Sequence, residues 1–353
     1  MEYVKLIQDL IRTCPVSSDV NAVNKASGML FDFLRGKGLF CTKETWNGRT
    51  IVYASVKQEK TPDFLMNAHL DVVPPSEEGQ FEPVIKDGWM IGRGTGDCIG
   101  NAVCIAKVLC ELDKGVSAGA IFSADEEIGG KTTHYMVEHG YSAKKMICVM
   151  DHWDNGKITY AQKGTLGLQI TARGKGGHSS IPWLADNPVD KLIDGYLRLR
   201  QAWTNPTRDD TWKKSMAATI LQGSPVLNQI PDSAYMRLHF RLVREEERQE
   251  IIDLVKKTTG LEVSVVAGRP PVSLDKDNPE LRLFASIVEK HNGKPAEFSR
   301  MFGATDACWF LPCGVPIAMF GIEYEGLHAK GERAKLSSFE SCAAILKELA
   351  QSL

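Results

Sequence analysis

Apolar positions in the first 160 residues follow two alternating patterns. In residues 2–13 and 19–38, apolar residues recur every three to four positions, which predicts two amphipathic helices. Short continuous apolar runs come next, as expected for strands buried on both faces. We predict these strands near 50–56, 62–69, 118–124 and 145–151, with helices near 100–113 and 131–139. Strands alternating with helices predict an α/β fold with a mostly parallel sheet covered on both faces.

Residues 165–268 follow a different order. Their apolar pattern predicts strand, helix, strand, strand, helix and strand, which is typical of a ferredoxin-like α+β unit. The α/β pattern resumes with a helix near 278–291. We therefore predict an α/β domain formed by 1–164 and 269–353, into which the α+β domain is inserted.

Composition excludes several classes of protein. The 353 residues are 43% hydrophobic and 24% charged, which is ordinary for a soluble globular protein. A net charge of −2 creates no basic field that would attract nucleic acid. No apolar run approaches the ~20 residues that a membrane span needs. Nine cysteines without a CxxC pair fit free thiols, so we expect a cytoplasmic protein that binds neither nucleic acid nor membrane.

The stretch MNAHLDVVPP, residues 66–75, is the first candidate for chemistry. His69 and Asp71 are two positions apart at the end of a predicted strand, so their side chains share one face. The pair could be a metal ligand with its orienting partner, or a hydrogen-bonded pair that caps a loop.

Other acidic residues and a histidine also follow predicted strands or lie in glycine-rich loops: Asp97, Asp125, Glu126, Glu127, Asp151 and His328. Strand ends on one edge of an α/β sheet bring such residues together. Two histidines with carboxylates suit zinc or a similar ion, and the set fits two ions that share a carboxylate. Glu126 and Glu127 would point in opposite directions in an extended segment, which leaves one for acid/base work.

The segments HLDVVP, GRGTGD, SADEEIGG, VMD and GLHAKGE resemble, in order and spacing, the dinuclear zinc aminoacylase/carboxypeptidase family. That family includes acetylornithine deacetylase, succinyl-diaminopimelate desuccinylase, aminoacylase and glutamate carboxypeptidase. The resemblance implies a zinc-exopeptidase-like catalytic domain with an inserted lid and dimerisation domain. It also implies one role for each residue: His69 and Asp151 bind the first ion, Glu127 and His328 bind the second, Asp97 bridges them, Asp71 orients His69, and Glu126 is the general base.

The inserted domain also resembles the family. In GKGGHSSIP, His178 would help to polarise the scissile carbonyl, in dimers from the neighbouring subunit. In NQIPDSAYMRLHFR, the resemblance points to Asn228 and Arg241, and Arg241 would clamp the substrate carboxylate. In MFGATDA, Gly303 and Thr305 would belong to a substrate-binding loop of the catalytic domain.

The implied function is hydrolysis of an amide bond next to a free carboxylate, through a metal-bridging hydroxide and a glutamate base. The ions would be zinc, with cobalt or manganese as alternatives, and the chain would form a homodimer through the inserted domain. The motifs do not separate an exopeptidase or dipeptidase from an N-acyl-amino-acid deacylase.

One segment departs from the family pattern. After the bridging aspartate the family usually has an acidic or small residue and then Lys-Gly, whereas this chain has Cys98, Ile99 and Gly100. The missing lysine leaves the substrate open, and it suggests a metal-binding member without catalysis as the alternative function. Cys98 could be a soft metal ligand, an oxidation target or a small buried residue.

Overall fold

The computed structural model describes residues 2–353, which form two compact units. The first unit runs up to Ala161 and includes Ser273–Arg300 and Thr305–Leu353. The second consists of Gln162–Val272 and Met301–Ala304. The short segment Met301–Ala304 therefore groups with the second unit, although it lies outside the 165–268 range that the apolar pattern suggests.

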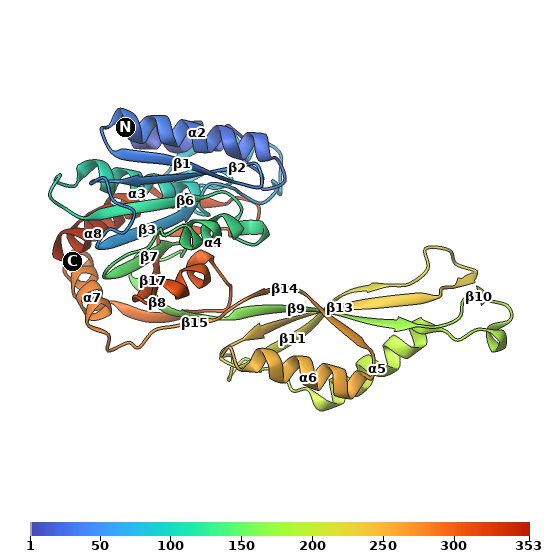
Figure 1. Ribbon diagram of the computed structural model, residues 1–353. Helices are drawn as coiled ribbons and strands as arrows, with labels where there is room; N and C mark the ends of the chain where they lie inside the picture. Colours follow the sequence, from blue (N-terminus) through green and yellow to red (C-terminus); the bar gives the residue numbers. More distant parts are fainter. Residues whose placement is uncertain (1) are drawn as a thin grey trace. The chain divides into compact units, whose positions relative to one another are not determined.

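A nine-stranded sheet forms the centre of the first unit (Figure 1), with the strand order β1-β2-β6-β3-β7-β17-β8-β15 and with β16 also paired to β8. The strands β6, β3, β7 and β17 run parallel to one another, and β1, β2 and β8 pair antiparallel to their neighbours. The predicted mostly parallel sheet is therefore confirmed. The strand bounds are β1 Phe40–Trp46, β2 Arg49–Ser55, β3 Phe64–His69, β6 Ala118–Ser123, β7 Met146–Met150, β8 Lys157–Gln162, β15 Val272–Ser273, β16 Glu297–Met301 and β17 Ile317–Phe320.

Both faces of the central strands are buried, which is why their sequences read as continuous apolar runs. Phe64, Met66 and Ala68 of β3 face a core that they share with buried residues of five helices. These helices are α1 Glu2–Ile11, α2 Val20–Gly36, α3 Ile99–Glu111, α7 Pro279–Asn292 and α8 Leu336–Ser352. The alternate residues of the strands face the other way. Helix α4 (Lys131–Glu138) and the 3₁₀ helix η3 (Asp306–Cys313) contact β6, β7 and β17, and their side chains lie outside this core.

A small second sheet, which the apolar pattern did not predict, brings distant loops together. Its strand order is β18-β19-β5-β4. The bounds are β4 Val84–Lys86, β5 Trp89–Ile91, β18 Tyr324–Glu325 and β19 Arg333–Lys335. Because β5 pairs with β19, the loop that carries His328 lies beside the segment that leads to Asp97, and the Gly92 N–H donates to the Glu332 carbonyl oxygen at 2.8 Å.

The second unit has the predicted ferredoxin-like order. Its antiparallel sheet runs β11-β13-β9-β14, and α5 and α6 pack on it. Alternate residues of β13, from Ala234 to Leu242, are buried in a separate core, so the intervening residues face away from that core. The bounds are β9 Gly164–Arg173, α5 Pro188–Ala202, β11 Ser215–Gln222, β13 Ser233–Leu242, α6 Glu247–Thr259 and β14 Glu262–Arg269, with a short ribbon of β10 Gly177–His178 and β12 Gln229–Ile230.

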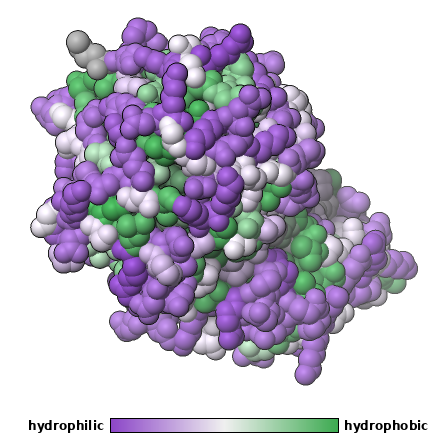
Figure 2. Space-filling model, turned by 60° about the vertical axis from the view of Figure 1, so that its left-hand side comes forward, coloured by the Kyte–Doolittle hydropathy of each residue, from purple (hydrophilic) through white to green (hydrophobic). Residues whose placement is uncertain are grey.

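Within residues 2–353, no helix combines the length and the apolar composition that crossing a bilayer requires. Hydrophilic residues predominate on the face shown in Figure 2, and hydrophobic residues gather there in smaller patches. This agrees with the absence of any long apolar run in the sequence.

Candidate metal centre

Parallel strands deliver the predicted ligands to one edge of the large sheet. His69 is the last residue of β3, Asp151 directly follows β7, and Glu126 and Glu127 lie just after β6. The carboxyl ends of parallel neighbours meet at the same edge. Asp97 and His328 arrive from the two loops that the small sheet joins.

Two overlapping groups of side chains could each hold an ion. The ligand atoms of His69, Asp97, Cys98 and Asp151 lie within 4.8 Å of one another, as do those of Asp97, Glu127 and His328. Asp97 belongs to both groups, and each of its oxygens faces a different histidine. Its Oδ1 is 3.0 Å from His69 Nε2, and its Oδ2 is 3.0 Å from His328 Nε2. This is the arrangement that a bridging carboxylate requires.

The charges of these side chains fit divalent cations. Burial and then the carboxylate of Asp97 raise the pKa of Asp151 to about 7. Hydrogen bonds to Asp97 and Glu127 raise the pKa of His328 to about 10, so an imidazolium offsets part of the negative charge. A divalent cation between these groups would relieve the same repulsion. The imidazole and carboxylate donors suit zinc and related ions.

Asp71 has a wider role than the motif suggested. The nearer contact of His69 Nδ1 is the backbone oxygen of Asp71 at 2.8 Å, and the carboxylate Oδ1 lies at 3.5 Å. A proton on Nδ1 leaves Nε2 free to bind an ion. The Asp71 carboxylate also accepts the backbone N–H groups of Glu126 and Glu127, at 3.0 and 3.3 Å, and the hydroxyl of Ser17 at 2.7 Å.

The predicted extended conformation of Glu126 and Glu127 is wrong. Glu126 and Glu127 are not extended, because they begin the 3₁₀ helix η1, Glu126–Ile128. The Asp71 carboxylate binds the N–H groups that the first turn of a helix leaves without partners. The two glutamate side chains therefore leave the backbone about a third of a turn apart, and not on opposite faces as in a strand. Glu126 is buried and Glu127 is half-buried.

Glu332 is a buried carboxylate that the sequence analysis did not identify. Its Oε1 accepts the backbone N–H groups of Gly94, Gly96 and Asp97 at 2.9, 3.2 and 3.3 Å, and Oε2 accepts Arg93 Nη1 at 2.6 Å. Burial and the charge of Asp97 raise the pKa of Glu332 to about 7, whereas Arg93 lowers it. Glu332 thus holds the loop that positions Asp97. Its only signal in the sequence was its place at the end of GLHAKGE.

Cys98 is fully buried next to the predicted bridge. Its thiol donates to the carbonyl oxygen of Met150 at 2.8 Å, and burial raises its pKa to about 12. The peptide bond between Asp97 and Cys98 is cis. Gly96 precedes them because a Cβ there would lie 2.2 Å from the ring of Tyr324.

The remaining predicted residues fall in three places. His178 and Asn228 lie together in the second unit, where the N–H of Ser179 donates to the Asn228 carbonyl oxygen at 3.0 Å. Arg241 and Gly303 line a cavity of about 570 Å³ in the same unit. Thr305 lies in the first unit, where its hydroxyl caps η3 by accepting the N–H of Ala307 at 3.2 Å.

His178 presents a defined tautomer. Its Nδ1 accepts the backbone N–H of Ser180 at 3.2 Å and lies 2.7 Å from the Ser180 hydroxyl. Because Nδ1 is an acceptor, the proton of a neutral ring is on Nε2. The exposed imidazole can therefore donate a hydrogen bond from Nε2.

Comparisons with known proteins agree with this geometry. The family model described as "Peptidase family M20/M25/M40" matches residues 65–352. A succinyl-diaminopimelate desuccinylase from Rhodospirillum centenum is 27% identical over 98% of this chain and 95% of its own length. The fold is similar to that of an M20 family metallo-carboxypeptidase from Sulfolobus solfataricus, with a TM-score of 0.82, 16% identity and coverage of 99% of both chains. A di-peptidase from Saccharomyces cerevisiae has a TM-score of 0.77 and 15% identity, with coverage of 99% of this chain and 95% of its own.

The family match spans most of the chain and includes the segments that converge on Asp97. The resemblance that the motifs indicated is therefore confirmed at the level of family and fold. The chain belongs to peptidase family M20/M25/M40, and it is a metal-dependent hydrolase that acts on C–N bonds.

Proposed function

We propose that this protein hydrolyses an amide bond next to a free carboxylate, in a small peptide or an N-acyl amino acid, with two zinc ions bridged by Asp97. The observation that supports this most directly is the position of Asp97 between two histidines, with 3.0 Å from each of its oxygens to a different ring. His69 and Asp151 would complete one site, and Glu127 and His328 the other. When bound, the ions would supply Lewis-acid activation of the amide carbonyl and of water.

Glu126 is the proposed proton carrier. Its backbone N–H is bonded to Asp71, and Glu127, the next residue, belongs to one of the two ligand groups. Its carboxylate would take a proton from the attacking water and deliver it to the leaving amine. This division of work gives the two adjacent glutamates different roles, one as a ligand and one as the base.

Arg241 and His178 are the proposed substrate contacts. The guanidinium of Arg241 would bind the substrate carboxylate as a planar fork. The Nε2–H of His178 would donate to the carbonyl oxygen as negative charge develops there. We propose that it does so in the neighbouring subunit of a homodimer formed through the second unit.

Metal removal and a substrate comparison test this proposal. Protein treated with a chelator should lose activity and regain it on addition of zinc, cobalt or manganese. The reconstituted enzyme should hydrolyse an N-acetyl amino acid or a dipeptide, and the same compounds with an amidated carboxyl end are the control. Equal rates on the free acids and the amides would refute the requirement for a carboxylate. Bound metal without hydrolysis of any such compound would favour the non-catalytic alternative.

A variant pair on β13 tests the carboxylate clamp. Arg241→Lys keeps the charge but loses the planar fork, so KM for the free acids should rise with little change in thermal stability. Arg237→Lys is the matched control, because Arg237 shares the strand face but is exposed and donates to Gln169 at 3.2 Å. Unchanged KM in Arg241→Lys would assign the clamp to another residue.

A further inference from the structure

The cavity that contains Arg241 has a strongly basic character. Its charged lining residues are Lys163, Arg208 and Arg241, and no acidic side chain lines it among the described residues. Ser215, Thr207 and Thr211 add hydroxyl groups. Asp210, in the same loop as Arg208, forms an ion pair with Lys213 instead. The cavity therefore offers positive charge and hydrogen-bond donors to a ligand.

Strand register explains how Arg241 enters the cavity. Arg241 pairs with Ser215 on one side and with Thr165 on the other, and Thr165 pairs in turn with Arg269. Arg241 and Arg269 therefore lie in one row across the sheet. Neighbours of Arg241 along the strand, Phe240 and Leu242, point into the core, so Arg241 points away from it. Burial and then the charge of Arg269 lower the pKa of Arg241. A bound anion would offset the repulsion between these two positive charges.

Lys163 holds the loop that carries Arg208. Its Nζ donates to the carbonyl oxygens of Thr211 and Lys213, at 2.8 and 2.6 Å. It also lies 5.0 Å from the ring centre of Phe302, which forms part of the cavity wall. Lys163 is thus engaged in fixing the loop, and the arginines remain as the groups available to a ligand.

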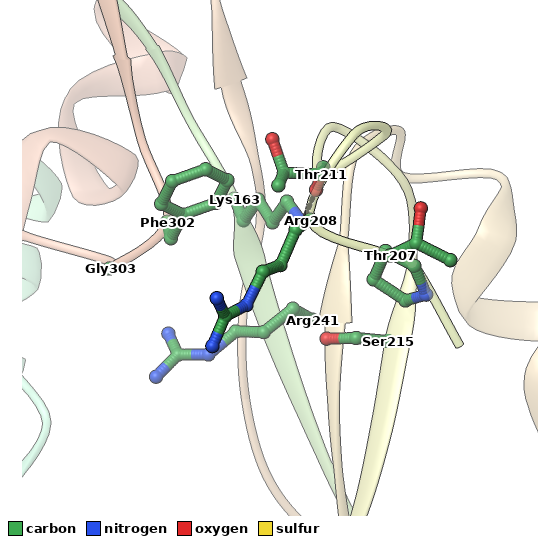
Figure 3. Close-up of a pocket in the computed structure, with 9 residues that line it drawn as sticks. Lys163, Thr207, Arg208, Thr211, Ser215, Arg241, Phe302 and Gly303 are labelled. Carbon is green, nitrogen blue, oxygen red and sulfur yellow. Dashed lines mark hydrogen bonds between the residues drawn. The ribbon is translucent and has the colours of Figure 1, made fainter.

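Arg208, from the loop, and Arg241, from the strand, both line the cavity, and in Figure 3 their side chains extend toward the same open side of it. Neither side chain forms a hydrogen bond or an ion pair with any described residue. An anion in the cavity would face two positive charges that have no anionic partner among the described residues. Each planar fork matches one carboxylate.

We propose that Arg208 and Arg241 together select substrates in which the residue bearing the free α-carboxylate also has a carboxylate side chain, as in aspartate or glutamate. The inference rests on the proposed function in one respect, which is that Arg241 holds the α-carboxylate. Arg208 then binds the side-chain carboxylate, and it determines specificity without taking part in the hydrolysis.

Binding to metal-free protein tests the inference separately from turnover. Isothermal titration calorimetry should show that glutamate binds at least about tenfold more tightly than glutamine. The side-chain amide of glutamine cannot form the bidentate ion pair that a carboxylate forms with the guanidinium of Arg208. Arg208→Gln should bring the two affinities together by weakening glutamate alone, and Arg208→Lys should have an intermediate effect. Arg237→Gln, on the same face of β13 and outside the cavity lining, should leave both affinities unchanged.

Kinetics provides the second measurement. In the wild type, kcat/KM for N-acetylglutamate should exceed kcat/KM for N-acetylglutamine by a similar factor. Arg208→Gln should remove this difference by lowering the value for N-acetylglutamate. Equal binding of glutamate and glutamine would overturn the inference, as would tighter binding of inorganic phosphate than of glutamate. Preferential binding of glutamate without any hydrolysis would leave the inference standing and refute the proposed function.

Discussion

Replacing Glu332 by glutamine tests whether one buried carboxylate supports the whole Asp97 loop. Glu332 and Arg93 are both fully buried, and their nearest atoms are 2.6 Å apart. A glutamine can still accept the backbone N–H groups of Gly94, Gly96 and Asp97 through its one oxygen. Its amide group, however, would place a donor against Arg93 Nη1 and leave a buried guanidinium without its anion.

The expected magnitude follows from that loss. Removing one partner of a buried ion pair destabilises a protein by about 3–5 kcal/mol. For a unit of this size, this corresponds to a fall in melting temperature of about 6–20 °C. The same residue supports the Asp97 loop, and the unpaired guanidinium would disturb that support. Metal affinity should therefore also fall, by roughly 10–100-fold, as it does when groups that support metal ligands are altered.

The assay compares Glu332→Gln with Glu348→Gln at pH 8, above the pKa of about 7 at Glu332. Glu348 also has two side-chain partners, Lys290 and His291, but it is partly exposed to solvent. The control should lose less than about 1 kcal/mol. Thermal unfolding and competition with a chelator measure the two effects. If Glu332→Gln melts within a degree or two of the control and binds metal as the wild type does, the support attributed to Glu332 is refuted.

Four further outcomes are expected. Glu126→Gln should keep bound metal and lose about 10²–10⁴-fold in kcat, and a loss of only a few-fold would refute its role as the base. Asp97→Asn should lower the content of both ions, measured by elemental analysis, because both sites share Asp97; loss of one ion alone would contradict the bridge. Cobalt-loaded protein should lack thiolate-to-cobalt charge-transfer absorption, because the buried Cys98 thiol donates a hydrogen bond to a backbone oxygen. A charge-transfer band that is present in the wild type and absent in Cys98→Ser would show that Cys98 is a ligand. Mixing inactive His178→Ala and Glu126→Gln dimers should restore up to about half of the activity per mixed dimer, because one of its two sites has both residues intact. No recovery despite subunit exchange would mean that His178 acts within its own chain or takes no part in the reaction.

Local sequence patterns were sufficient for the architecture and for most of the candidate centre. Buried parallel strands read as continuous apolar runs, and their carboxyl ends must meet at one edge. Those two rules were enough to group His69, Asp151 and the pair Glu126 and Glu127 at one edge of the sheet. Glycine-rich loops pointed to Asp97 and His328 as further candidates, and the resemblance of GRGTGD, SADEEIGG and GLHAKGE to a family then gave each residue its expected role.

Tertiary structure decided what depends on contacts between distant segments. The 3₁₀ turn at Glu126 accompanies bonds to Asp71, which is 55 residues away, and the position of Asp97 depends on Glu332, which is 235 residues away. The cavity that Arg208 and Arg241 share likewise requires a loop held by Lys163 beside a strand face. A local sequence pattern cannot predict these distant partners, because a buried carboxylate or arginine is stabilised by groups that only the folded chain brings within hydrogen-bonding distance.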